Sequence, residues 1–255
     1  MSTVASYSIK GGVGKTTTAV NLSWVAANEG RRVLLWDLDP QAAATYCLRV
    51  APKVRGGVKS VLRRDGEAAR HIKASNHDGL DLLPADFSYR WMDSLLEDMK
   101  RPRKRLRDVL GHIVDEYDLI VLDCAPSISL TSENVFRAAD LLLVPLIPSP
   151  LSMRTFAQLR RHLRRDGPKR LQLASFFSMA DSRKRLHKDI IAQHLGRQDG
   201  LLRTVIPYAS DVELMSVRRA PLPSYAPSNR AAQAYSRLWH EVEKLLSSTP
   251  DSVDE

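Results

Sequence analysis

The sequence predicts an α/β fold in which a doubly wound, mostly parallel sheet is flanked by helices. Apolar runs rich in β-branched residues recur along the chain, separated by segments of helix length. Within these runs the apolar residues are nearly continuous instead of alternating with polar ones, which is typical of strands buried on both faces. Helices on both sides of the sheet would provide that burial. The runs occupy residues 3–9, 31–39, 80–85, 117–123, 140–146, 171–179 and 201–207.

Four segments have the features of helices. The first covers 15–28 and stops before Gly30, because glycine commonly follows the last helical residue. Others are expected over about 103–116 and after Pro150. A final helix over 231–246 has apolar side chains on one face, so it should pack on the body of the protein. That face consists of Ala234, Leu238, Val242 and Leu245.

The length of 255 residues suits one large domain. We expect a single domain over 1–247 and a disordered acidic tail over 248–255. No stretch approaches the roughly 18 apolar residues of a membrane-spanning helix, and the start lacks the features of a secretory signal, so we expect a cytoplasmic protein. Cys47 and Cys124 lie far apart, with no ligand-like spacing to each other or to histidines, which argues against a metal site or a disulfide framework.

The net charge of +9 and the pI near 9.7 indicate polyanions among the partners of this protein. Charge alone does not distinguish DNA from a membrane surface. The basic residues cluster in three runs, at 100–107, 160–165 and 181–188. Each run is either a solvated helix face or part of a binding surface.

A glycine-rich turn joins the first predicted strand to the first predicted helix and reads KGGVGKTTT over residues 10–18. Glycines let the backbone curl until several N–H groups point at one phosphate, and the helix N-terminus adds a favourable dipole. Lys15 would then meet the β- and γ-phosphates, with the Thr16 hydroxyl on Mg²⁺. Ile9 stands where the usual pattern has its first glycine. The expected nucleotide contacts are Gly11, Gly12, Val13, Gly14, Lys15, Thr16 and Thr17.

The segment from Lys10 to Thr17 resembles the deviant P-loop of the ParA/MinD family of positioning ATPases. The resemblance implies that ATP and Mg²⁺ are the cofactors and that the protein forms an ATP-dependent homodimer with nucleotide sandwiched between subunits. It also implies that Lys10 reaches across the interface to the ATP of the other subunit. A cation supplied in this way would neutralise charge that develops on the transferred phosphoryl group.

Further segments are similar to the family over almost the whole chain. In DLDPQ, the resemblance implies that Asp39 positions the attacking water and that Asp37 lies near the water shell of the metal. In LIVLDCAPS, it implies that Asp123 holds Mg²⁺ through water. Later segments similar to the family imply that Met179 and Pro207 lie against the adenine.

Several related families share this ATP site but have different functions. A MinD-like membrane-associated ATPase needs a basic amphipathic helix at its end, whereas here an acidic tail follows the last helix. Bacterial tyrosine kinases have a tyrosine-rich tail, and the nitrogenase iron protein has cysteines that hold a cluster. This sequence has neither feature. A ligase of the dethiobiotin synthetase type uses the same fold, but the segments after residue 140 resemble ParA instead.

The remaining interpretation is a small ParA-type partition ATPase without an N-terminal DNA-reading domain, because the predicted P-loop strand starts at residue 3. The resemblance implies a cytoplasmic, nucleoid-associated protein that binds double-stranded DNA without sequence preference. It also implies a ParB-like or cargo adaptor protein that stimulates hydrolysis, so that a plasmid, a chromosome or a protein complex is segregated or positioned. Because sequence-independent binding relies on Lys and Arg contacts to phosphates, it should weaken steeply with salt.

One departure from the family concerns the DNA surface. An equal-length alignment with the family places Asp211 where many members have a DNA-contacting arginine, and a carboxylate cannot hold a phosphate. DNA binding is therefore either lost or moved to other basic residues. The candidates are Arg197, Arg203, Arg218 and Arg219.

Overall fold

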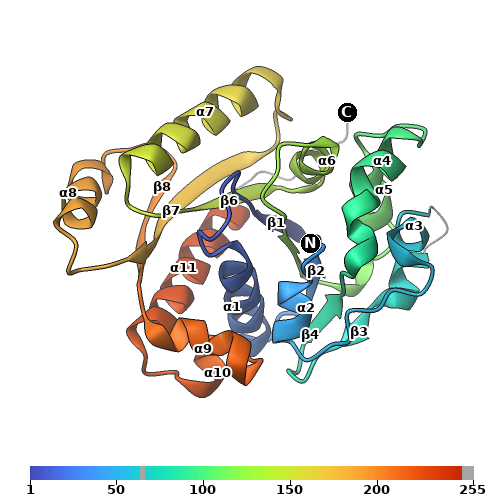
Figure 1. Ribbon diagram of the computed structural model, residues 1–255, viewed down its shortest axis with the longest axis horizontal. Coiled ribbons are helices and arrows are strands. Elements are labelled where there is room, and N and C mark those ends of the chain that lie inside the picture. The colour runs from blue at the N-terminus through green and yellow to red at the C-terminus, as the bar shows by residue number, and fades with distance from the viewer. Residues whose placement is uncertain (64–66, 249–255) are drawn as a thin grey trace.

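The computed structural model of the chain describes residues 1–63 and 67–248 and is built around one sheet (Figure 1). In the described part of the chain this sheet has eight strands in the order β3-β4-β2-β5-β1-β6-β7-β8. Every neighbouring pair is parallel except β3 with β4. The strands are β1 (Ser2–Ser6), β2 (Val33–Asp37), β3 (Lys73–Ala74), β4 (Leu80–Leu83), β5 (Leu119–Asp123), β6 (Leu141–Leu146), β7 (Gln172–Ala180) and β8 (Leu201–Pro207).

Helices cover both faces of the sheet, as Figure 1 shows. One face packs against α1, α2, α9, α10 and α11 and the other against α3 to α8, with a separate apolar core on each side. The helices are α1 (Lys15–Asn28), α2 (Ala43–Cys47), α3 (Gly57–Val61), α4 (Met92–Glu97), α5 (Arg105–Leu110), α6 (Leu130–Ala138), α7 (Pro150–Asp166), α8 (Arg185–His194), α9 (Ser210–Arg218), α10 (Leu222–Tyr225) and α11 (Arg230–Ser247), with 3-10 turns at Glu67–His71, Phe87–Trp91 and Val114–Glu116.

The central strands explain why the predicted apolar runs are continuous. Strands β2, β5 and β6 are buried at every position, because helices lie above and below them. Strand β1 sits between β5 and β6, where the direction of the strand order reverses. Ligands of open α/β sheets bind at the carboxyl ends of the strands near such a reversal. The residues that follow β1, β2 and β5 therefore lie where this kind of sheet binds a ligand.

The predicted fold class is confirmed, and each predicted strand has a counterpart. The helix predicted over about 103–116 is wrong in its length: α5 ends at Leu110, Gly111 follows, and a short 3-10 turn completes the segment. Glycine has poor helix propensity, which explains the break. The two-residue strand β3 was not predicted. Apart from Ser248, the predicted tail over 248–255 lies outside the described residues.

None of the described helices combines the length and apolar character needed to cross a membrane. The terminal helix α11 instead buries its apolar face against the body, as its sequence pattern predicts. Ala234, Leu238 and Val242 are buried in the core that also contains α1. Helix α11 therefore forms part of the fold, and its packing depends on contacts with α1 and β8.

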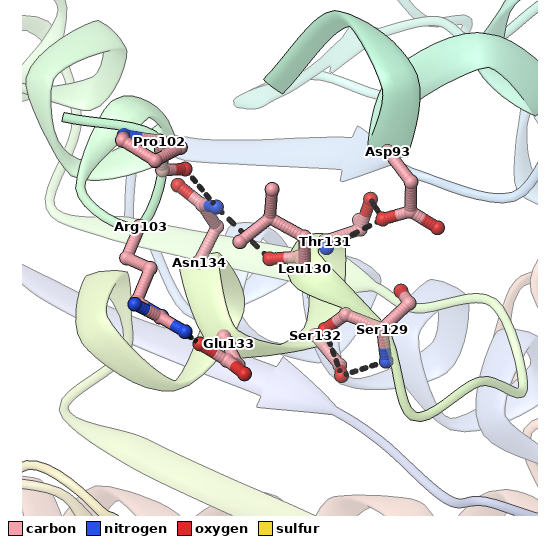
Figure 2. Close-up of polar contacts among 9 residues, drawn as sticks. All are labelled: Asp93, Pro102, Arg103, Ser129, Leu130, Thr131, Ser132, Glu133 and Asn134. Atoms are coloured by element: carbon pink, nitrogen blue, oxygen red, sulfur yellow. Dashed lines mark hydrogen bonds and ion pairs between the residues drawn. The ribbon is translucent and has the colours of Figure 1, made fainter. Parts of the chain in front are cut away.

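Helix α6 follows the carboxyl end of β5 and is fixed by polar contacts with α4 and with the segment just before α5, shown in Figure 2. The Thr131 backbone N–H and hydroxyl both donate to the Asp93 carboxylate at 2.7 Å. The buried Asn134 amide donates to the carbonyl oxygens of Pro102 at 2.7 Å and Leu130 at 2.9 Å. These contacts fix the far end of the loop that leaves Asp123.

We expect Asn134→Ala to lower the free energy of unfolding by about 2–3 kcal/mol, because it leaves the buried Leu106 N–H and the Pro102 carbonyl without their partner. Urea denaturation measures this change. The matched control is Arg103→Ala, which removes the exposed ion pair with Glu133 and should cost at most about 1 kcal/mol. Equal losses for the two variants would contradict the anchoring role of Asn134.

Candidate active site

The loop between β1 and α1 curls around the N-terminus of α1. Gly12 and Gly14 adopt φ angles of +69° and +94°, a region that other residues rarely enter. A β-carbon on Gly14 would also lie 3.0 Å from the Ser178 hydroxyl oxygen. Among the described residues no side chain caps α1, so its first backbone N–H groups remain available. This arrangement suits a phosphate.

The two lysines of the loop have different environments. Lys15 is only 7% exposed, and its Nζ donates to the Lys10 carbonyl oxygen at 3.3 Å. Burial lowers the pKa of Lys15, and the nearby carboxylate of Asp123 opposes that shift. The Lys10 side chain is half-buried and forms no ion pair within the described part of the chain. Lys15 thus points into the protein, whereas Lys10 remains accessible at the surface of the loop.

Two carboxylates end adjacent strands beside this loop, since Asp37 of β2 pairs in register with Asp123 of β5. Both side chains are fully buried. Asp37 accepts hydrogen bonds from the Thr45 backbone N–H at 2.9 Å, the Thr45 hydroxyl at 2.8 Å and the Asp39 N–H at 3.1 Å. Burial raises the pKa of Asp37 to about 6 in spite of these hydrogen bonds.

Asp123 is the least satisfied group of the site. Both of its carboxylate oxygens are buried without a well-formed hydrogen bond from the described residues, although the Thr16 hydroxyl lies close by. Burial raises the pKa of Asp123 well above its usual range and the charge of Asp37 adds to the rise, while the Thr16 hydroxyl and Lys15 oppose it. Because an unpartnered buried carboxylate is costly, this site is suited to a cation.

The donor set fits a hard divalent ion. The described residues contain no group of three or more His, Cys, Asp or Glu side chains that could hold a metal by themselves. The oxygens of Thr16, Asp123 and Asp37 can therefore supply only part of a coordination or water shell. Mg²⁺ is typically held in this way, by a few protein oxygens together with water and the phosphates of a nucleotide.

Asp39 lies in the turn that leaves β2. Its carboxylate is half-exposed and accepts a hydrogen bond from the Gln41 N–H at 2.9 Å, while its carbonyl oxygen accepts one from the Ala42 N–H at 2.8 Å. Of the three aspartates, Asp39 is thus the one that solvent can reach.

A pocket of about 230 Å³ opens beside the glycine loop, and both predicted adenine residues line it. Met179, at the end of β7, adopts a left-handed φ of +54°, which is rare for a residue with a β-carbon. The pocket also contains Gly12, Gly14 and Thr17, so it is continuous with the loop. Sequence reasoning missed several lining residues, because side chains at the ends of β7 and β8, in the segment that follows β8 and on α9 and α11 belong to no motif: Ser178, Ile206, Tyr208, Ala209, Val212, Glu213 and Tyr235.

The four arginines predicted to bind DNA do not form one surface. Arg218 and Arg219 lie at the end of α9, whereas Arg203 lies on the edge strand β8 and Arg197 on the loop before it. Asp211, at the position where many family members have an arginine, forms hydrogen bonds within the protein. Its carboxylate accepts a hydrogen bond from the Asn229 amide at 2.6 Å, and its carbonyl oxygen accepts one from the Tyr225 hydroxyl at 2.6 Å.

Comparison with known proteins gives consistent relatives. Residues 1–167 match the family described as "AAA domain". The chain is 32% identical to the sporulation initiation inhibitor protein Soj of Bacillus subtilis, covering 91% of this chain and 94% of Soj. It is 36% identical to the chromosome-partitioning ATPase Soj of Thermus thermophilus, covering 91% and 92% of the two chains. A crystal structure of cobyrinic acid a,c-diamide synthase from Mycobacterium smegmatis with bound ADP and magnesium has a TM-score of 0.81 and 26% identity, covering 97% of this chain and 96% of that one.

The parallel sheet, the glycine loop before α1 and the two carboxylates at the strand ends define the P-loop nucleotide-binding fold. The similar proteins identify the family within this class. The chain belongs to the ParA/MinD family of ATPases.

We expect Gly14→Ala to abolish nucleotide binding, because the added β-carbon forces both a strained φ and a contact with Ser178. Gly30→Ala is the matched control: its φ is +90°, but nothing lies within 4 Å of the new β-carbon. Each variant should lose about 1–2 kcal/mol of stability from backbone strain, measured by urea denaturation. Only Gly14→Ala should lose binding in a titration with a fluorescent ATP analogue. Parental affinity in Gly14→Ala would exclude this loop as the phosphate site.

We expect Asp123→Asn to raise the free energy of unfolding of the nucleotide-free protein by about 1–3 kcal/mol, because a neutral amide avoids the cost of ionising a buried carboxylate next to Asp37. The same variant should lose the increase in nucleotide affinity that Mg²⁺ gives the parent. Denaturation and nucleotide titrations with and without Mg²⁺ measure the two effects. Asp39→Asn, at a half-exposed carboxylate, should change stability by at most about 0.5 kcal/mol. A less stable Asp123→Asn protein would contradict the idea that the site awaits a cation.

Proposed function

We propose that this protein is an ATP-dependent dimerising ATPase that binds nucleoid DNA without sequence preference and segregates or positions a cargo. A single P-loop domain over 1–247 performs these functions in the cytoplasm. The cargo is a plasmid, a chromosome or a protein complex, and a ParB-like or adaptor protein on it stimulates hydrolysis. The observation that carries the proposal is the loop with one buried and one accessible lysine beside the unpartnered Asp123. Names of relatives that refer to chromosome partitioning support it.

In this mechanism each residue of the site has a separate task. The backbone N–H groups of residues 11–17 bind the phosphates, and Lys15 neutralises them from inside the protein. Thr16 and, through water, Asp123 would hold Mg²⁺, with Asp37 near its water shell; the bound ion would neutralise charge on the phosphates. Asp39 orients a water for in-line attack on the γ-phosphate. Met179 and Pro207 pack against the adenine in the adjacent pocket.

A second subunit completes the site in this proposal. The carboxyl edge of the sheet exposes large apolar side chains, with Ile128 71% exposed in the loop after β5 and Leu151 57% exposed in the first turn of α7, which follows β6. Lys10 belongs to the loop after β1 at the same edge. Apolar side chains around an accessible cation support a protein partner at this edge. Lys10 would then contact the nucleotide of the partner subunit.

The alternative functions differ in chemistry. A ligase on the same fold is represented by the diamide synthase structure at 26% identity, whereas identity to the Soj proteins is 32% and 36%. A ligase would consume ATP only in the presence of an acid to be activated. A MinD-like membrane role would need a basic apolar segment, and α11 instead packs in the core.

We expect Lys10→Ala to bind ATP like the parent but to neither dimerise nor hydrolyse it, because the cation for the partner's nucleotide is missing. Size-exclusion chromatography with ATP and a phosphate-release assay without any acid substrate measure this. Lys15→Ala should lose hydrolysis, and Asp39→Ala should accumulate as an ATP-bound dimer. Hydrolysis at the parental rate in Lys10→Ala would remove Lys10 from its role. Turnover only after an acid substrate is added would favour the ligase.

A further inference from the structure

A wide groove outside the nucleotide site is formed by the chain between α2 and β3. It has a volume of about 1040 Å³. Six of its described lining residues are cationic, and Glu67 is the one carboxylate among them. We call it the basic groove, and its cations are Arg49, Lys53, Arg55, Arg63, Arg70 and Lys73. For a chain with a net charge of +9, this is a large concentration of positive charge in one place.

Most of this charge is not neutralised within the protein. Arg63 forms an ion pair with Glu67 at 3.7 Å. In the part of the chain that the structure describes, the other five cations have no carboxylate partner. All six are exposed, so they have not been drawn into the core by packing. Closely spaced like charges repel one another, which makes the groove favourable for a polyanion.

The form of the groove suits an extended ligand more than a single small anion. Its cations extend from the end of α2, through the 3-10 turn at Glu67–His71, to β3. The described lining residues include no Phe, Tyr or Trp ring on which an unpaired base could stack, and the ring of the one histidine, His71, is hydrogen-bonded to the Ser60 hydroxyl at 2.9 Å. Exposed Lys and Arg side chains can contact the phosphates that repeat along the backbone of a duplex, and such binding needs no stacking ring.

Two of the four predicted DNA-binding arginines adjoin this groove. The Arg49 guanidinium donates to the carbonyl oxygens of Arg218 at 2.7 Å and Arg219 at 3.1 Å. In Figure 1, α2 lies between α9 and β3. Helix α2 therefore connects the basic groove to the region of Arg218 and Arg219. Arg203 lies on β8, at the opposite edge of the sheet from β3. The charge therefore extends from the groove toward α9, away from Arg203.

The same groove is connected to the nucleotide site through α2. Thr45 of α2 donates two hydrogen bonds to Asp37, and Arg49 lies just beyond the end of the helix. Cys47 of α2 donates from its thiol to the Met215 carbonyl oxygen at 3.8 Å, which links α2 to α9. Helix α2 thus contacts Asp37 of the nucleotide site, lies against α9 and leads directly to Arg49 of the groove.

We propose that the basic groove, continued by Arg218 and Arg219, is the surface that binds duplex DNA through its phosphates, with no reading of the base sequence. This inference rests on the DNA binding included in the proposed function and assigns it to a particular surface. It excludes Arg197 and Arg203 from the contact.

The test compares two double charge reversals of equal charge change. Arg55→Glu/Arg70→Glu alters two exposed groove cations that have no ion pair in the described structure, and Arg197→Glu/Arg203→Glu alters two exposed cations near β8. Gel shifts with ATP on two unrelated duplexes are repeated at rising salt. The groove variant should bind at least about tenfold more weakly, and its salt slope should fall by about two. The control should stay within about twofold of the parent. ATP hydrolysis without DNA should be parental in both, which shows that they are folded.

The possible outcomes separate the inference from the proposed function. If the parent binds DNA and the groove variant binds equally well, only the location is wrong. Equal weakening of both variants would mean that overall charge, not the groove, determines affinity, and would also overturn the assignment. If the parent retards no duplex even at low salt, DNA binding itself fails together with this inference. Displacement of DNA by an acidic peptide at equal charge concentration, with the groove variant losing peptide binding more than DNA binding, would assign the groove to a protein partner instead.

Discussion

The burial of two carboxylates side by side at the ends of β2 and β5 is the constraint on which the rest of the site depends. Parallel pairing brings Asp37 and Asp123 into register, and the helices on both faces remove them from water. Asp37 accepts hydrogen bonds from Thr45, whereas the oxygens of Asp123 have no well-formed hydrogen bond among the described residues. The fold therefore holds a local excess of negative charge beside a loop that can bind phosphate, and a divalent cation can satisfy both.

The glycine loop lies beside these two carboxylates. Its left-handed residues, Gly12 and Gly14, direct the backbone so that α1 begins without a side-chain cap in the described structure. Lys15 compensates part of the carboxylate charge while its own pKa is lowered by burial. The loop, the lysine and the aspartates are each unfavourable in isolation and become favourable together with a ligand. Such locally unfavourable features concentrate at functional sites.

The sequence predicted the strands well because burial on both faces leaves a continuous apolar pattern, as in β5 and β6. Helix α1 was equally clear, since Gly14 and Gly30 flank it. Short elements such as α2, α3 and β3 were not predicted, because five residues or fewer carry no periodicity and owe their form to tertiary contacts. The pattern placed Asp123 at a strand end but could not reveal that its oxygens lack partners. The basic groove was also invisible in sequence, because its cations are spread singly from residue 49 to residue 73.

The two cysteines have a practical consequence. Cys47 and Cys124 are both buried, and burial raises the pKa of the Cys47 thiol to about 11 and that of Cys124 well above its usual range. Since the thiolate is the reactive form, neither is expected to react readily with maleimides or mild oxidants at neutral pH. A single cysteine introduced on the surface would therefore take a fluorophore selectively without prior removal of the native thiols. Energy transfer between subunits labelled in this way could follow assembly and disassembly in real time.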